Sequence, residues 1–284
     1  MSATYASAVR HARSFLFVPA TRPERFVKAM DSGADCVIID LEDAVAEGSK
    51  DSARDQLAQH LRQLTPAQLA RTVVRVNAVG TLWHEADMAL LRNWAGQGAA
   101  VMLPKSEDAG ALRGVAQKLG DAACIVALIE SLAGLDAADA LSREPHVVRL
   151  AFGHLDFQLD LGIRATADEP ELAFARSALV AASRRARLPA PIDGVTTDTG
   201  NAERLAVDVR RARAFGFGGK LCIHPVQAAA VNEAFGHTEA ERAWARRVLE
   251  EAARHGGEAF SLDGRMVDLP VIRAAEAIVG GKRE

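Results

Sequence analysis

The chain has 284 residues, of which 49% are hydrophobic and 25% are charged. This composition predicts a globular protein with a sizeable core and excludes an intrinsically disordered chain. Thirty-four lysines and arginines stand against 37 aspartates and glutamates, for a formal net charge of −3, and no basic block is present, which argues against nucleic acid as a partner.

The first residues, MSATYASAVRHARS, lack the apolar centre of a secretory signal, so we expect a frayed tail here. After it, eight apolar runs of strand length recur, each followed by a polar or glycine-containing break and a stretch of helical periodicity. In chain order they are residues 14–20, 36–43, 72–78, 100–105, 124–130, 148–157, 190–195 and 219–225.

Near-continuous apolar strands that alternate with helices indicate a parallel sheet covered by helices, because each parallel crossover needs a helix. Eight such units fit a closed (β/α)8 TIM barrel. An open doubly wound sheet is the alternative, but the chain has no glycine-rich GxGxxG turn, which favours the closed barrel.

The pattern changes after Pro225. Residues 226–235 and 238–256 have helical periodicity, and AFSLDGRMVDLP predicts a hairpin that turns at Asp263 and Gly264 before Pro270 opens a last helix. We therefore predict a barrel over residues 1–225 and a C-terminal helical and hairpin extension over residues 226–284. The extension either caps its own barrel or contacts a neighbouring subunit.

The longest apolar runs are far shorter than the ~20 residues that cross a bilayer, so we expect no membrane partner. Three cysteines, Cys36, Cys124 and Cys222, are widely separated inside apolar runs, which is neither a disulfide framework nor a metal-binding spacing. We expect buried free thiols in a cytoplasmic protein.

In a parallel barrel, the C-terminal ends of the strands line one mouth, where such enzymes place their sites. Charged residues lie at or just after the C-terminal end of nearly every predicted strand, namely Arg22, Asp40, Glu42, Asp43, Arg75, Lys105, Glu130, Asp156, Asp193 and His224. A ring of carboxylates with a few cations between them suits a hard divalent cation and an anionic substrate.

Glu130 and Asp156 are the best candidates for metal ligands, because adjacent strands can present two carboxylates to one ion. Without a neighbouring His or Cys ligand, they favour magnesium, or manganese in its place, over zinc. The competing interpretation is that Glu130 caps the following helix and Asp156 hydrogen-bonds a local turn.

Arg75 ends an apolar strand, so its guanidinium either pairs with a carboxylate at the mouth or receives a substrate carboxylate. If the second strand continues through its acidic end, Asp40 and Glu42 point to one face and Asp43 to the other. We expect these three carboxylates to orient metal-bound water, Arg75 or Lys105 from behind.

Several segments taken together carry a resemblance: FLFVPATRPERFVKAM, CVIIDLEDAV, VRVN, MLPK, ALIES, FGHLDFQLDLG, PIDGV and GFGGKLCIHPVQ. In this order they resemble the citrate lyase β-subunit-like family of the HpcH/HpaI aldolase superfamily, which includes malyl-CoA, citramalyl-CoA and citryl-CoA lyases. The resemblance covers roughly residues 13–283. It implies a barrel that assembles as a homotrimer or hexamer and acts on an acyl-CoA and a 2-oxo acid.

The resemblance also implies roles for individual residues. The metal ligands fall on Glu130 and Asp156, which would also hold substrate oxygens, and the substrate-binding arginine falls on Arg75. Coenzyme A contacts fall on Phe17, Val18, Arg22, Lys28, Ile223 and His224. The GRMVDLP segment matches an arm that supplies a catalytic aspartate to the neighbouring subunit, here Asp268; from the residues alone, Asp268 could equally be a helix N-cap.

The expected reaction is a reversible, magnesium-dependent cleavage of a 3-hydroxy-3-carboxylic acyl-CoA into an acyl-CoA, such as acetyl-CoA, and a 2-oxo acid. Arg75 would stabilise charge on the carbonyl oxygen and Asp268 would protonate the departing enolate. Three alternatives stay open: a thioesterase on the same substrates, a carrier-dependent citrate lyase β subunit, and a non-catalytic CoA-binding protein.

Overall fold

The computed structural model describes residues 8–256 and 258–280, and the chain divides into two compact units. The first unit ends at Phe235 and the second begins at Gly236. Within the described ranges, no helix combines the length and apolarity that crossing a membrane requires.

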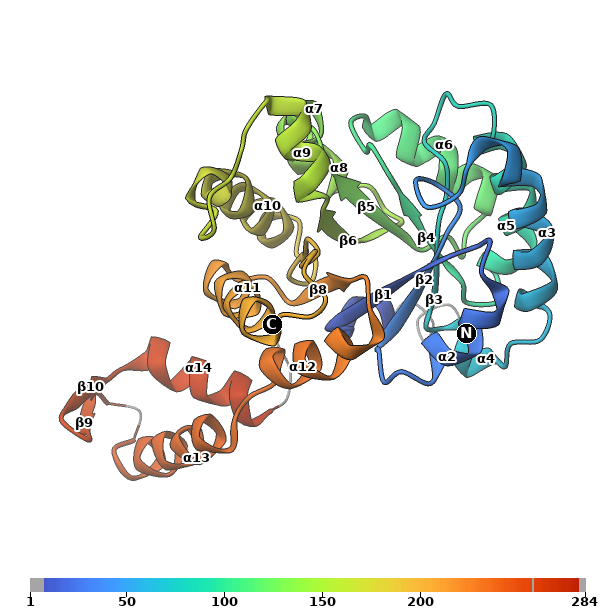
Figure 1. Cartoon of the computed structure of the whole chain (residues 1–284). Coiled ribbons are helices and arrows are strands. Elements are labelled where there is room, and N and C mark those ends of the chain that lie inside the picture. Colours follow the sequence, from blue (N-terminus) through green and yellow to red (C-terminus); the bar gives the residue numbers. More distant parts are fainter. Residues whose placement is uncertain (1–7, 257, 281–284) are drawn as a thin grey trace. The chain divides into compact units, whose positions relative to one another are not determined.

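The first unit is a closed barrel of eight parallel strands in sequence order, surrounded by helices (Figure 1). The ring closes where β1 pairs with β8, with Ser14 opposite Lys220. The predicted (β/α)8 fold is confirmed. The strands are β1 (Ser14–Pro19), β2 (Cys36–Asp40), β3 (Thr72–Arg75), β4 (Ala100–Leu103), β5 (Ile125–Ile129), β6 (Val147–Phe152), β7 (Ile192–Asp193) and β8 (Gly219–Cys222).

The strands are apolar almost throughout because both of their faces are buried. In β1, Phe15 belongs to the cluster inside the barrel, whereas Leu16 and Val18 belong to the cluster between strands and helices. This two-sided burial explains why the sequence shows continuous apolar runs instead of an alternating pattern.

The helices connect consecutive strands, and several begin at a side-chain cap. Asp108 accepts a hydrogen bond from the N–H of Ala111, and Asn201 accepts one from Arg204. The helices of this unit, with η for 3-10 turns, are η1 (Pro23–Arg25), α2 (Phe26–Met30), η2 (Glu47–Ser49), α3 (Lys50–Leu61), α4 (Pro66–Leu69), α5 (His84–Ala95), α6 (Ala109–Leu119), α7 (Leu132–Asp136), α8 (Ala138–Leu141), α9 (His154–Leu161), η3 (Pro170–Leu172), α10 (Ala173–Arg185), α11 (Ala202–Phe215) and α12 (Pro225–Phe235).

The expected N-terminal tail lies partly outside the described residues, since residues 1–7 are among those not described. For residues 8–12 the expectation of fraying is wrong. Val9 and Ala12 are buried, and Arg149 of β6 donates hydrogen bonds to both of their carbonyls, at 3.2 and 2.5 Å. A buried arginine beneath the barrel therefore anchors this segment.

Several elements differ from the predicted boundaries, and two of these differences bear on the barrel and its mouth. Helix α12, which we assigned to the extension, packs on β1, β8 and α11, so the first unit continues to Phe235 instead of ending at residue 225. The predicted strand 148–157 ends at Phe152, and His154 begins α9.

The three cysteines are buried free thiols, as expected, and burial raises the pKa of each to about 12.

The second unit contains α13 (Glu239–Arg254), a hairpin of β9 (Phe260–Leu262) and β10 (Arg265–Val267), and α14 (Leu269–Val279). Its own small core includes Val248, Phe260 and Ile272. The hairpin turns at Asp263 and Gly264 as predicted, and both have positive φ, the geometry of a type I′ turn.

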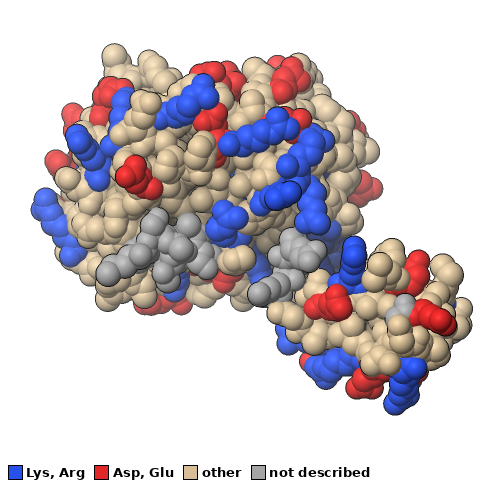
Figure 2. All heavy atoms as spheres, turned by 180° about the vertical axis from the view of Figure 1, so that it is seen from behind, with Lys and Arg blue, Asp and Glu red and all other residues tan. Residues whose placement is uncertain are grey.

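Lysines and arginines are interspersed with acidic side chains on the face of the molecule seen in Figure 2. The face opposite to that of Figure 1 shows a group of basic side chains on the barrel unit with acidic ones around it (Figure 2). This mixed pattern agrees with the small net charge of −3.

Candidate active site

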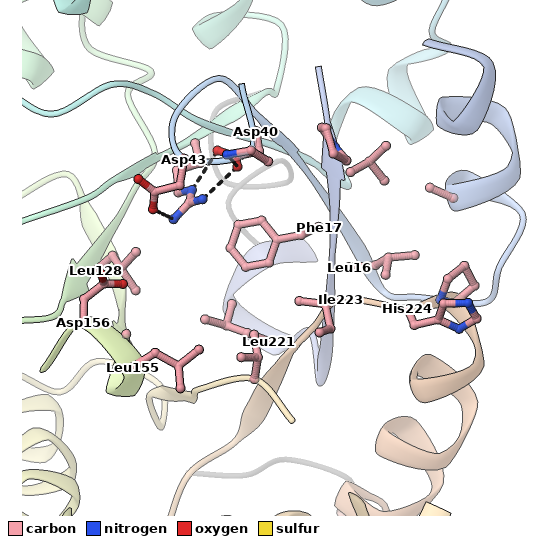
Figure 3. A pocket seen from close by; sticks show the side chains of 18 of the residues that line it. Leu16, Phe17, Asp40, Asp43, Leu128, Leu155, Asp156, Leu221, Ile223 and His224 are labelled. Carbon is pink, nitrogen blue, oxygen red and sulfur yellow. Dashed lines mark hydrogen bonds and ion pairs between the residues drawn. The ribbon is translucent and has the colours of Figure 1, made fainter. Parts of the chain in front are cut away.

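A cavity of about 1040 Å³ opens at the C-terminal ends of the barrel strands. Most of the residues singled out from the sequence lie on its wall (Figure 3): Phe17, Val18, Lys28, Asp40, Asp43, Arg75, Glu130, Asp156, Ile223 and His224. Arg22, Glu42 and Lys105 are not on the wall, although Glu42 and Lys105 contact residues that are. Asp268 belongs to the second unit.

Glu130 directly follows β5 and is only 4% exposed. Its Oε1 accepts the backbone N–H of Lys105 at 2.9 Å, and Lys105 has a φ of +47°, an unusual conformation for a lysine. Gly153 leaves the space for this carboxylate, because a Cβ atom there would lie 2.7 Å from Oε2 of Glu130. Ser131, not Glu130, caps α7, so the helix-cap interpretation of Glu130 is wrong.

Asp156 lies in the first turn of α9 and not on a strand as predicted. The strand ends early because the chain turns at Gly153, whose N–H still bonds to the carbonyl of Ile129 at 2.8 Å. In the described part of the chain, no hydrogen bond engages the Asp156 carboxylate, so it is not held in a local turn. It lines the cavity instead.

The carboxylates at this end of the barrel act on one another. Burial first, and then the charges of Glu42 and Asp156, raise the pKa of Glu130 to about 8. Burial likewise raises the pKa of Glu42 to about 7, although Arg75 opposes the shift. Like charges held together away from water are unfavourable, and a bound cation would relieve this repulsion.

Glu130 and Asp156 therefore fit a hard divalent cation, for which carboxylate oxygens are the preferred ligands. Among residues 8–256 and 258–280, no three His, Cys, Asp or Glu side chains come together as a metal-binding group. The remaining coordination positions would fall to water and substrate oxygens, as is usual for magnesium.

Arg75 is held by three acidic residues, one at the end of β2 and two in the turn that follows it. Its Nε and Nη2 donate to the two oxygens of Asp40 at 2.8 and 2.7 Å, and its Nη1 lies 3.1 Å from Glu42 and 3.3 Å from Asp43. Its guanidinium lies 4.9 Å from the ring centre of Phe17. Dashed lines in Figure 3 mark the contacts of this guanidinium with Asp40 and Asp43.

The expectation that Asp43 faces away from Asp40 and Glu42 is wrong. Strand β2 ends at Asp40, and the alternation of a strand does not continue through the turn that follows. The sequence also missed Lys50 of α3, which is buried and donates to the carbonyls of Leu41 and Glu42 at 2.7 and 2.8 Å. Lys50 thereby holds this acidic turn in place.

The wall near β1 and β8 presents the residues expected to contact coenzyme A, with one replacement. Arg22 is half exposed and pairs with Glu24 at 2.6 Å. Arg25 lies on the wall instead, beside Lys28. The helical spacing of three residues between Arg25 and Lys28 was the signal that could have identified this pair.

His154 and Val195 also line the cavity and were missed from the sequence. Burial lowers the pKa of His154 to about 4, so its imidazole is neutral near pH 7. Its ring packs directly over Gly194, where a Cβ atom would lie 2.0 Å from Nδ1. A histidine in an apolar motif gives little sequence signal, because most such residues are structural.

In the second unit, Asp268 occupies the N-cap position of α14, but its side chain makes no capping hydrogen bond. Asp268 therefore occupies the predicted N-cap position, but its carboxylate does not act as a cap.

Asp193, which we counted among the charged residues at the mouth, is fully buried behind the wall.

A closed barrel with two carboxylates and an arginine on a cavity at the C-terminal ends of its strands has the arrangement of barrel enzymes, whose sites lie at this mouth. The family model described as HpcH/HpaI aldolase/citrate lyase matches residues 13–225, and the chain belongs to this family.

Curated relatives cover nearly the whole chain. A citrate lyase subunit beta-like protein of Deinococcus radiodurans is 37% identical over 94% of this chain and 96% of its own. A (3S)-malyl-CoA thioesterase of Cereibacter sphaeroides is 32% identical, over 94% and 93%, and the mitochondrial citramalyl-CoA lyase of Rattus norvegicus is 30% identical, over 94% and 85%. The relatives therefore include both lyases and thioesterases.

Among solved structures, the CitE protein of Mycobacterium tuberculosis in complex with magnesium, acetoacetate and coenzyme A matches with a TM-score of 0.82. It is 36% identical, and the match covers 95% of this chain and 98% of that one. The match includes the second unit as well as the barrel.

Proposed function

We propose that this protein is a magnesium-dependent lyase that reversibly cleaves a 3-hydroxy-3-carboxylic acyl-CoA, of the malyl, citramalyl or citryl type, into an acyl-CoA and a 2-oxo acid. The observation that carries the proposal is the pairing of Glu130 and Asp156 on the wall of one cavity, beside Arg75. The CitE structure, which is a complex with magnesium, acetoacetate and coenzyme A, supports both the cation and the thioester substrate.

Glu130 and Asp156 would hold the cation, which when bound lowers the pKa of the substrate hydroxyl and polarises the adjacent carboxylate. Lys105 keeps Glu130 in place through its backbone N–H, while Gly153 leaves the room that the carboxylate needs. These contacts fix the ligand geometry before substrate arrives.

Arg75 supplies the positive charge that the cleavage needs. As the carbon–carbon bond breaks, the hydroxyl gives its proton to solvent and becomes the carbonyl of the 2-oxo acid, while the bonding electrons form the enolate of the acyl-CoA. A fixed guanidinium beside the developing charge stabilises it without reorganisation. Asp40 holds Arg75 in a bidentate pair, so its position on the wall is defined.

The enolate carbon then takes up a proton, which we assign to Asp268 of a neighbouring subunit in a homotrimer or hexamer. The absence of a side-chain cap bond on Asp268 supports this role, because its carboxylate is not committed to its own helix. In the synthetic direction, the same carboxylate would remove the proton.

A second candidate is a thioesterase, favoured by the malyl-CoA thioesterase relative, which matches as much of the chain as the lyase relative does. The same residues would then direct water to the thioester carbonyl. The products separate the two: a lyase releases an acyl-CoA and a 2-oxo acid, whereas a thioesterase releases free coenzyme A and the hydroxy acid.

The test is to incubate the purified protein and magnesium with malyl-CoA, citramalyl-CoA and citryl-CoA, and to follow 2-oxo acid, acyl-CoA and free thiol separately. Formation of a 2-oxo acid that stops on chelation supports the lyase. Free thiol without 2-oxo acid supports the thioesterase, and binding of coenzyme A without turnover of any substrate contradicts both.

A further inference from the structure

Strand β7 is too short to hold its own end of the barrel. It comprises only Ile192 and Asp193, which pair with Gly219 and Lys220 of β8, and the ladder stops there. Two residues later, Val195 lines the cavity. Something other than strand pairing must therefore fix this part of the wall.

Gln227 of α12 connects the two chain segments beyond the point where the hydrogen bonds between β7 and β8 end. It is only 2% exposed, and its Nε2 donates to the carbonyl of Thr196 at 2.9 Å. Its Oε1 accepts the backbone N–H groups of Ile223 and His224, at 2.9 and 3.2 Å. One side chain thus joins the segment after β7 to the segment after β8.

Further contacts hold the β7 side of this connection. Lys220 donates from Nζ to the carbonyl of Gly194 at 2.5 Å, and the hydroxyl of Thr196 donates to Asp208 at 2.7 Å. Val195 therefore lies between two residues, Gly194 and Thr196, whose carbonyls are both bound by buried side chains. On the β8 side, Ile223 and His224 line the same cavity.

We propose that Gln227 is a positioning residue that sets the separation between Val195 and Ile223, the two walls of the cavity beyond β7 and β8. This inference rests on the proposed function and on the coenzyme A contacts that the family resemblance implies for Ile223 and His224, both of which line the cavity. Gln227 would act through the backbone of these residues and would not touch the substrate itself.

The bonds explain why an amide is needed at this position. Glutamate keeps two acceptor oxygens for Ile223 and His224, but it has no N–H for Thr196 and would place a negative oxygen against that carbonyl. An unpaired buried carbonyl is costly, so the two walls should separate. We expect Gln227→Glu to weaken binding of coenzyme A and raise KM about tenfold, with a smaller effect on kcat.

Asn232→Asp is a matched control on the same helix. Asn232 donates from Nδ2 to the carbonyl of Gly33 at 2.9 Å, so the substitution removes the same kind of bond. It is not on the cavity wall. Both variants should lose thermal stability, but only Gln227→Glu should change KM and the dissociation constant of coenzyme A.

The experiment measures, for the full chain and both variants, binding of coenzyme A by calorimetry, kcat and KM for the best acyl-CoA, and melting temperature. A tenfold effect of Gln227→Glu on binding and KM, with Asn232→Asp within about twofold of wild type, supports the proposal. Equal effects of both variants, or a lower melting temperature with unchanged binding and KM, would overturn it.

Gln227→Met, which is similar in volume and introduces no charge, replaces Gln227→Glu if that variant does not fold, with the same expected outcome. If the wild-type protein cleaves none of the acyl-CoA substrates, the proposed function fails. The affinity for coenzyme A alone still decides whether Gln227 positions the wall, so the two failures are distinguishable.

Discussion

Arg75→Lys tests whether the guanidinium acts in catalysis or only holds the acidic turn. Arg75 makes two hydrogen bonds to Asp40, which is 1% exposed, and lies 3.1 Å from Glu42. An ammonium group keeps the charge but cannot reach both oxygens of Asp40 together with Glu42. Losing one buried, charge-assisted hydrogen bond costs about 1.5–3 kcal/mol, so the free energy of unfolding should fall by about that amount.

If Arg75 also stabilises charge in the transition state, kcat should fall by about 10²–10³. Arg71→Lys is the matched control, because Arg71 precedes the same strand and donates to the backbone carbonyls of Met30, Ala34 and Asp35, at 3.0–3.1 Å. Thermal unfolding and steady-state kinetics should show similar losses of stability in both variants and a loss of kcat only in Arg75→Lys. Normal turnover in a destabilised Arg75→Lys protein would refute the catalytic role.

Three further predictions concern the carboxylates. Glu130→Ala and Asp156→Ala should each abolish magnesium binding by calorimetry and the rise in melting temperature on adding magnesium; full turnover after exhaustive chelation would contradict this. Burial raises the pKa of Glu130 from 4.5 to about 8, so between these pH values the folded state retains a proton that the unfolded state has released. Without metal, the free energy of unfolding should therefore fall as pH rises through this range. The contribution of Glu130 to this fall is at most about 1.4 kcal/mol per pH unit. Urea unfolding from pH 5 to 8 measures how steeply the free energy of unfolding depends on pH. Both the substitution Glu130→Gln and added magnesium should make this dependence weaker. An unchanged dependence in Glu130→Gln would show that other groups cause it. Finally, mixing inactive Asp268→Asn with inactive Glu130→Ala subunits should restore partial activity if the arm acts in trans, and no rescue despite demonstrated subunit exchange would show that each barrel works alone.

The sequence was sufficient for the barrel because both faces of its strands are buried. Continuous apolar runs alternate with segments of helical periodicity. A sheet built from eight such strand–helix units can close into a barrel in only a few ways. It was also sufficient for the hairpin at Asp263 and Gly264, since positive φ at both turn positions requires particular residues. Glu130 could be placed at the cavity from the sequence because it ends an apolar strand, where a charge has no role in a core. Asp156 also lines the cavity, although the sequence placed it on a strand and it lies in α9.

Only the tertiary structure decided how these groups are held. Asp43 contacts Arg75 because β2 ends at Asp40, and where a strand ends depends on its neighbours as well as on its own residues. Arg25, and not Arg22, lies on the wall, which depends on how the turn after β1 leads into α2.

Lys50 and Gln227 act on backbone groups that are distant in sequence or in different segments of the wall, so no local pattern identifies them. Local periodicity reports which face of an element is buried. The contacts that fix a site depend on segments brought together by closure of the barrel, and these contacts become visible only in the folded chain.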